Sequence, residues 1–333
     1  PPLSFCIAAS YSAKNHPFDP HRDLFKYDPS VRSKLSTLRP RPGIRPQSGQ
    51  DSFFVSDVGE TGTVAFGVVD GVGGWESSGV DPAHFAHGLC DHMAMGAARY
   101  PAEFRAGPLR PRELLQYGYD QVMSTDEIVA GGSTACVASI EPNGRLNVAN
   151  LGDSGFIHLG PNHVRHFSKP QTHAFNTPYQ LSKIPPFMQL QMRLFGPAEA
   201  HAETPADAHL SHHQLHPGDV LIFATDGVWD NLSPEDTLKL VGRTMQANGA
   251  WVVGEEGVTI GNLRGGQGTK DGGGECQLCS ALAVAVTREA KEASLNGMRE
   301  GPFAREVRRH FPGEQWMGGK PDDICTVVAV VRE

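Results

Sequence analysis

Two aspartates stand at the ends of uninterrupted apolar segments, and they are the residues with the clearest capacity for chemistry. The segment 64–69 leads directly into Asp70, and a second one, VLIFAT, leads into Asp226. Apolar side chains at every position predict strands that are buried on both faces. An ionised carboxylate at the end of such a strand is costly unless it is protonated, paired with a base or bound to a metal ion. Gly71, which follows the first acid, lets the backbone turn sharply beside it.

The order of the strands is expected to bring two further aspartates to the same place. The segments 52–58 and 63–69 are joined by GETG, a short connection that is typical of a β-hairpin. In a hairpin the start of the first strand lies beside the end of the second, so Asp51 and Asp70 share an edge. Asp322 precedes the last apolar segment, ICTVVAVV. If that strand runs antiparallel to the other two, Asp70, Asp226 and Asp322 meet at one rim.

Four carboxylates at one rim predict a site for hard metal ions. At an effective dielectric constant of about 20, two unit charges about 4 Å apart repel by roughly 4 kcal/mol, so several ionised neighbours need cations. Ligands that are all oxygen favour Mg²⁺ or Mn²⁺. A pair of such ions can lower the pKa of a bridging water and clamp the phosphoryl oxygens of an in-line displacement. The alternative is that these are unrelated strand-end acids that cap surface turns.

Asp153 is less informative, because the sequence LGD places it in a tight turn between two predicted strands. An Asp in a turn commonly accepts hydrogen bonds from its own backbone. A functional role for Asp153 therefore stays open at this point.

The chain is expected to contain an irregular N-terminal arm followed by one domain. Residues 1–48 are rich in Pro, Ser and Arg and lack a sustained apolar period, so the domain is placed at 49–333. Residues 254–274 are dense in Gly and are predicted to form a flexible surface insertion. Helices are predicted at 82–95, 112–123, 234–246 and 281–293, with a short one within 179–194. Further strands are predicted at 131–140, 146–150, 154–159, 220–225 and 324–331.

Composition excludes several classes of partner. The net charge of −8 argues against binding to nucleic acid.

No apolar segment approaches the roughly 18 residues that a transmembrane helix needs, so no transmembrane segment is expected. The six cysteines are scattered and predict no disulfide framework. We expect a monomer.

Three local clusters have both a functional and a structural interpretation. The basic cluster before the first predicted strand is interpreted as a solvated arm, with contact to substrate or phosphate as the alternative. The CxxC at 276–279 is interpreted as helix core rather than a zinc site, because no second pair accompanies it. Five of the six histidines in the 168–216 region are interpreted as solvated rather than metal-binding. The basic residues are Arg32, Lys34, Arg39, Arg41 and Arg45, and the histidines are His201, His209, His212, His213 and His216.

Six segments in order resemble one family. GQDSFF, VVDGVGGW, GGSTACVA, ANLGDSGF, LIFATDGVWD and KPDDICTVV have the order and spacing of the metal-dependent Ser/Thr protein phosphatases of type 2C, the PPM family. The motifs extend over most of residues 49–332. The GVGGW loop and the KPQTHAFNTPYQL segment are most similar to the mitochondrial branch of that family.

The resemblance implies an α+β fold, a central β-sandwich of two antiparallel sheets flanked by helices, with two Mn²⁺ or Mg²⁺ ions at one end. By position, Asp70 would bridge both ions, and the Gly71 carbonyl would bind the second. Asp226 and Asp322 would hold the first ion, and Asp51 would act through a metal-bound water. Asp153 would serve a third, weaker ion. The implied reaction is hydrolysis of phosphoserine and phosphothreonine by direct attack of a metal-activated water, without a covalent enzyme intermediate.

Three positions depart from the family pattern. Val72 occupies the place where many relatives carry a His that protonates the leaving group, so the general acid is unassigned. Gln50 replaces the acid that usually precedes Asp51. The phosphate-binding Arg of many relatives has no counterpart at the same spacing, and Arg45 is the displaced candidate.

The resemblance also implies a location and leaves two rival functions. The mitochondrial matrix is expected, with a role in mitochondrial metabolism such as coenzyme Q biosynthesis, and with a targeting peptide that this chain does not include. The substrates would be phosphorylated proteins. A phosphoesterase acting on small phosphates would share the same acids, and a non-catalytic binding protein of the same fold gains slight support from Val72 and Gln50.

Overall fold

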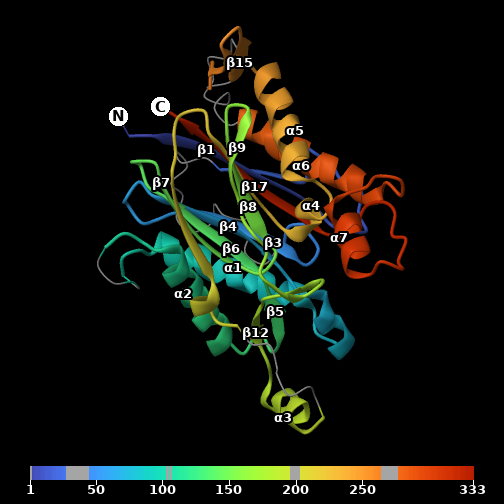
Figure 1. Ribbon diagram of the computed structural model, residues 1–333. Coiled ribbons are helices and arrows are strands. Elements are labelled where there is room, and N and C mark those ends of the chain that lie inside the picture. Colours follow the sequence, from blue (N-terminus) through green and yellow to red (C-terminus); the bar gives the residue numbers. More distant parts are fainter. Residues whose placement is uncertain (1, 28–44, 103, 105–106, 196–202, 264–276) are drawn as a thin grey trace.

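Two antiparallel β-sheets pack face to face at the centre of the computed structural model, which describes residues 2–27, 45–102, 104, 107–195, 203–263 and 277–333 (Figure 1). Helices cover the outer face of each sheet, so the predicted α+β sandwich flanked by helices is confirmed. Within the described residues, one sheet has the strand order β2 (Leu24–Lys26), β1 (Ser4–Ser12), β17 (Ile324–Arg332), β14 (Val220–Ala224), β8 (Gly155–Gly160) and β9 (His163–Phe167). The other has the order β13 (His209–Gln214), β7 (Arg145–Leu151), β6 (Ala135–Ile140), β4 (Val64–Asp70) and β3 (Asp51–Asp57).

Large apolar side chains fill the space between the sheets. Phe66 of β4 meets Phe223 of β14 edge to face, with ring centroids 4.9 Å apart, and Phe156 of β8 stacks on Phe223 at 4.9 Å. Ile7 of β1 and Val327 of β17 belong to the same buried cluster. Because helices bury the outer faces as well, the central strands β4, β14 and β17 are apolar at nearly every position, which is the pattern that the sequence shows.

Each outer face has its own layer of helices. The helices α1 (Pro82–Ala98) and α2 (Pro111–Ser124) pack on the five-stranded sheet, and α5 (Pro234–Ala247) and α6 (Gln277–Leu295) pack on the six-stranded sheet. These four helices confirm the four that the sequence predicted. Asp81 caps α1 by accepting a hydrogen bond from the Ala83 amide at 3.0 Å, and Ser233 and Asp236 form a capping box at the start of α5.

Shorter elements complete the fold, and several of them lie at the end of the sandwich that carries the acids. The four-residue helix α4 (Asp226–Trp229) follows β14, and α7 (Pro302–His310) lies beside it in Figure 1. A 3₁₀ helix, Gly73–Ser78, follows β4, and a second one spans Pro205–Asp207. Paired short strands are β5 (Gly131–Ser133) with β12 (Leu181–Lys183), β10 (Thr172–Ala174) with β11 (Thr177–Pro178), and β15 (Trp251–Gly254) with β16 (Gly257–Ile260).

The predicted irregular arm is wrong for the first part of the chain. β1 pairs with β17 along its whole length, and Ile7 to Ala9 are fully buried. Ser and Ala dilute the apolar signal of this strand, and the partner that buries it lies at the other end of the sequence. The fold therefore begins before Gly49, whereas most of the basic arm, 28–44, lies outside the described residues.

The Gly-rich insertion and the region 168–216 also contain structure that the sequence did not predict. Residues 251–260 form the β15–β16 hairpin, and 264–274 lie outside the described residues. The predicted short helix is present as α3 (Pro186–Phe195), but strand β13 was missed. His213 of β13 is only partly solvated, because its ring packs 4.6 Å from that of His166 and 5.4 Å from that of Phe156. His201 lies outside the described residues.

The second cysteine of the CxxC segment, Cys279, lies in a helix, as predicted. Cys279 is buried in α6 and donates a hydrogen bond to the carbonyl of Cys6 in β1 at 2.8 Å. Cys276 lies outside the described residues.

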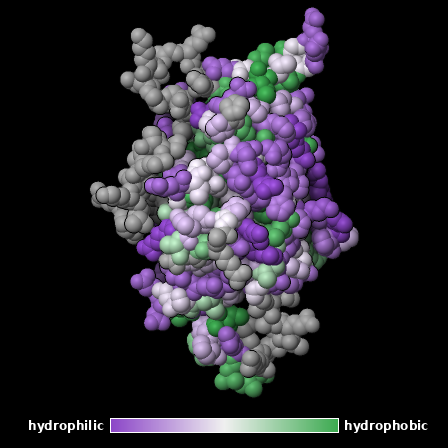
Figure 2. Space-filling view, turned by 90° about the vertical axis from the view of Figure 1, so that its left-hand side faces the viewer, coloured by the Kyte–Doolittle hydropathy of each residue, from purple (hydrophilic) through white to green (hydrophobic). Residues whose placement is uncertain are grey.

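Some of the exposed apolar side chains lie on two elements that project from the body. Figure 2 shows hydrophobic colour at the two ends of the visible face, at the levels where Figure 1 places α3 and the β15–β16 hairpin. The exposed residues there are Phe187, Leu190, Leu194, Val252, Val253 and Ile260. Among the described helices, none combines the length and apolar character needed to cross a bilayer.

Replacing Ile7 by Ala tests whether β1 belongs to the core. Ile7 is fully buried between the sheets, so the cavity should lower the free energy of unfolding by about 2–5 kcal/mol, as measured by urea denaturation. The matched control is Ile260→Ala in the exposed part of β16, where we expect a loss below about 1 kcal/mol. Equal effects of the two substitutions would contradict a core position for β1.

Candidate active site

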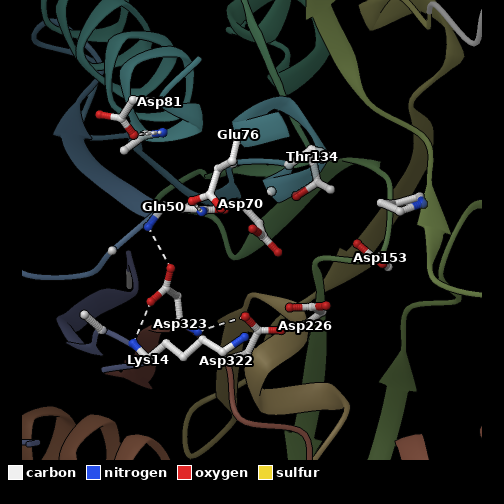
Figure 3. Close-up of a pocket in the computed structure, with 18 of the residues that line it drawn as sticks. Lys14, Gln50, Asp70, Glu76, Asp81, Thr134, Asp153, Asp226, Asp322 and Asp323 are labelled. Carbon is white, nitrogen blue, oxygen red and sulfur yellow. Dashed lines mark hydrogen bonds between the residues drawn. The ribbon is translucent and has the colours of Figure 1, made fainter. Parts of the chain in front are cut away.

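A pocket of about 1150 Å³ opens at the end of the sandwich where β4 and β14 end and β17 begins. Asp70, Asp226, Asp322 and Asp153 all line it, and Figure 3 shows that they come from separate segments of the chain. β14 and β17 are antiparallel neighbours, as the convergence required. β4 belongs to the facing sheet, so the acids meet across the sandwich rather than along one sheet edge.

Asp51 and Asp70 are directly opposite each other in the β3–β4 hairpin. Asp51 is fully buried beneath the pocket and accepts a hydrogen bond from the hydroxyl of Thr225 at 2.7 Å. Burial raises the pKa of Asp51 well above its usual range, and the nearby charge of Asp323 adds to the rise. Burial raises the pKa of Asp70 in the same way, followed by the charges of Asp51 and Asp226. These two carboxyl groups are therefore protonated more easily than an aspartate in water.

Glycines allow the two Asp-Gly segments to lie close to their neighbours. A Cβ atom on Gly71 would come within 2.9 Å of the carbonyl oxygens of Gln50 and Pro82, and one on Gly227 would lie 2.0 Å from the carbonyl oxygen of Asp323. A side chain at either position would push its segment out of place. In each segment the acid lines the pocket, and the glycine after it allows the backbone to pack closely enough to hold that acid in place.

Asp153 lies in the turn that carries the chain from one sheet to the other. This turn joins β7 of the five-stranded sheet to β8 of the six-stranded sheet, so it must cross the end of the sandwich. The Oδ1 atom of Asp153 is buried and has no hydrogen-bond partner among the described residues. Burial and the nearby charge of Asp226 raise the pKa of Asp153 to about 7. A buried carboxylate oxygen without a partner fits a place that a cation would occupy.

Lys320 is the main participant that the sequence reasoning missed. Its ammonium lies 2.6 Å from Asp226, 2.6 Å from Asp230 and 3.1 Å from Asp322. Burial works against its charge, but these carboxylates raise the pKa of Lys320 well above its usual range. Asp230 is one helical turn after Asp226, which is a spacing that the sequence shows, but the position of Lys320 two residues before Asp322 gave no such signal.

The three positions that depart from the family pattern, 45, 50 and 72, all line the pocket. Gln50 donates from its side-chain amide to Glu76 at 2.6 Å, and its backbone amide donates to Asp323 at 2.8 Å. Glu76 therefore brings an acid close to the position where Gln50 lacks one. Arg45 lines the pocket, but its guanidinium pairs with Asp81 at 3.1 Å. Val72 also lines the pocket and has no proton to give.

The carboxylate oxygens of the pocket are of the type that binds divalent ions, but two of the carboxylates also contact Lys320. The buried Asp51, the Asp70 opposite it and the unpaired oxygen of Asp153 are all groups that a hard cation would stabilise. In their present positions, no three His, Cys, Asp or Glu side chains of the described residues are arranged to hold one ion. The acids are not arranged around one ion because Asp226 and Asp322 each direct a carboxylate oxygen toward the ammonium of Lys320.

Comparison with known proteins identifies related phosphatases, although no family model matches the chain. The chain is 37% identical over 297 residues to the protein phosphatase PTC7 homolog fig of Drosophila ananassae, covering 88% of this chain and 76% of that protein. Its identity to the Drosophila virilis protein of the same name is 36% over 326 residues, covering 97% and 90%. Among solved structures, the photosystem II phosphatase PBCP matches with a TM-score of 0.61 at 25% identity, covering 85% of this chain and 91% of that one.

The substitution Asp70→Asn tests the electrostatic cost of the site. Because burial raises the pKa of Asp70 in the folded chain above the ~3.9 of an unfolded Asp, stability falls as pH rises through that window. In EDTA, the variant should therefore unfold at a higher temperature than the wild type at pH 8, with a smaller gain at pH 5. Differential scanning calorimetry measures both.

Added Mn²⁺ should reverse this order, because it stabilises the wild-type cluster more than the variant. The exposed Asp120→Asn serves as the control and should show neither effect. A gain for Asp70→Asn that is independent of pH and of Mn²⁺ would count against a cation site.

Proposed function

The chain belongs to the PTC7 family of type 2C protein phosphatases and is a Ser/Thr protein phosphatase; from this premise we propose that its activity depends on two divalent cations, Mn²⁺ or Mg²⁺, bound by the acids around Asp70. One observation carries the proposal: carboxylates from both sheets gather at one pocket, and Asp70 on its wall lies directly opposite the buried Asp51 in the β3–β4 hairpin. Such a cluster has a high electrostatic cost and no evident structural use.

We assign the ligands by their place in the pocket. Asp70 and the carbonyl of Gly71 form the wall at the end of β4, and Asp226 and Asp322 form the wall opposite. We propose that Asp70 is shared between the two ions, with Gly71 on the second and with Asp226 and Asp322 on the first. Asp51 lies deeper, so we assign it a contact through water. The third, weaker ion predicted beside Asp153 stays a prediction, to be weighed against Lys320 below.

The chemistry divides between the ions and the chain. When bound, a pair of divalent ions supplies a water of lowered pKa and positive charge that stabilises the phosphoryl oxygens. The chain orients these groups: the hydroxyl of Thr225 holds Asp51, and the hairpin register holds Asp51 opposite Asp70. A proton donor at position 72 is excluded because the side chain is Val, so the leaving oxygen takes its proton from another group.

We propose that the substrates are phosphoserine and phosphothreonine in proteins. The pocket is broad and open, as a phosphorylated peptide segment requires, and it extends from the acids to Asn176, Pro178 and Gln180. Arg45 stands on its rim and is half exposed, so it is the proposed contact to the phosphorylated segment, although its pairing with Asp81 limits that role. On the basis of the family alone, we also propose the mitochondrial matrix as its location and a role in mitochondrial metabolism such as coenzyme Q biosynthesis.

Turnover of p-nitrophenyl phosphate with Mn²⁺ tests the catalytic assignment. We expect Asp70→Asn to lower kcat/KM by at least about 100-fold, since even residues that only support metal ligands contribute about 10- to 100-fold. Asp120→Asn, exposed on α2, should keep wild-type activity. A wild type that is inactive with Mn²⁺, or an Asp70→Asn variant as active as the wild type, would refute the assignment.

Substrate class is tested by comparing a phosphothreonine peptide with a sugar phosphate under the same Mn²⁺ concentration. We expect the peptide to have the higher kcat/KM, because the open pocket offers contacts beyond the phosphoryl group. A preference for the sugar phosphate would favour a small-molecule phosphoesterase.

A further inference from the structure

The ammonium group of Lys320 forms ion pairs with carboxylates of the candidate site. A lysine ammonium has three N–H donors and no acceptor. Here it donates to Asp226 and Asp230, each at 2.6 Å, and lies 3.1 Å from Asp322. The side chain is mostly buried, so water screens these contacts only weakly. An ammonium in this position supplies a positive charge but no metal ligand.

The chain fixes Lys320 in this place through its backbone. Its amide donates to the side-chain oxygen of Asn231 at 2.9 Å, and the amide group of Asn231 donates to the carbonyl of Lys320 at 2.9 Å. Asn231 is buried and also donates to the carbonyl of Gly227, in the helix that carries Asp226. The stem of Lys320 lies over Phe303 of α7, with the ammonium 5.2 Å from the ring centroid. Lys320 and Asp226 are therefore attached to the same rigid unit.

We infer that Lys320 is a built-in cation of the site, which takes the place of a third divalent ion between Asp226 and Asp230, so that removing its charge creates one additional metal site. The inference rests on the proposed function, because it assumes that the same acids bind two ions. It concerns only the part of the site around Asp226, Asp230 and Asp153.

The geometry explains why an ammonium and a further ion exclude each other there. Mg²⁺ requires oxygen ligands at about 2.0–2.1 Å, and the Oδ2 atoms of Asp226 and Asp230 that would provide them are both engaged by Lys320. A divalent ion bound to both of these Oδ2 atoms would have to displace the ammonium of Lys320 from them. Without Lys320, these two acids and the unpaired oxygen of Asp153 would be left for a divalent ion.

Counting bound Mn²⁺ per chain tests the inference. The wild type, Lys320→Met and Lys320→Arg are dialysed against the same series of Mn²⁺ concentrations, and bound metal is measured by mass spectrometry. We expect Lys320→Met to bind one more ion than the wild type, and Lys320→Arg, which keeps the charge, to bind the wild-type number. Lys14→Met is the matched control, because Lys14 lines the same pocket but contacts Asp323 through its backbone amide; it should also bind the wild-type number.

A second measurement needs no substitution that removes the charge. In wild-type protein saturated with Mg²⁺, the side-chain nitrogen resonance of Lys320, assigned by its loss in Lys320→Arg, should remain that of a hydrogen-bonded ammonium protected from exchange. Equal Mn²⁺ counts in wild type and Lys320→Met, or release of the ammonium by Mg²⁺, would overturn the inference while leaving the proposed function intact. Absence of bound Mn²⁺ from every variant would remove the proposed function as well.

Discussion

Mutual repulsion among carboxylates at one end of the sandwich is the constraint on which the rest of the structure depends. Seven Asp or Glu side chains line the pocket, against three Lys or Arg. Such a concentration of like charge opposes folding, and it persists only where the surrounding chain is held rigidly. The rigidity comes from the apolar layer between the sheets, whose aromatic contacts lie directly behind the strand ends that carry Asp70 and Asp226.

The site is divided between the two sheets, so the packing of the sandwich determines its geometry. Asp51 and Asp70 come from the five-stranded sheet, whereas Asp226 and Asp322 flank strands of the six-stranded sheet. The hydrogen bond from Thr225 to Asp51 crosses from one sheet to the other at 2.7 Å. A shift of one sheet against the other would therefore separate the acids even if every side chain kept its conformation.

The sequence predicted the parts of the fold whose signals are local. Continuous apolar segments identified β4, β14 and β17, and Asp81 and Ser233 marked helix starts that the structure confirms. Strand β1 was missed because its burial depends on a partner more than 300 residues away, at Arg332 and its neighbours. The acids were placed together by strand direction alone, but their roles came from the family resemblance. Lys320 was missed because a lysine two residues before an aspartate has no meaning until the fold brings Asp226 and Asp230 beside it.

The pairing of β1 with β17 has a consequence for how the protein is made. Ser4 lies opposite Arg332, and β17 lies between β1 and β14 in the middle of its sheet. A ribosome releases β1 long before β17, so this sheet cannot close until β17 has emerged. Until then, the apolar strand β1 and the edge of β14 lack the strand that lies between them, and both are exposed to pairing with other chains. Nascent chains of this protein should accordingly need chaperones that cover strand edges until β17 emerges.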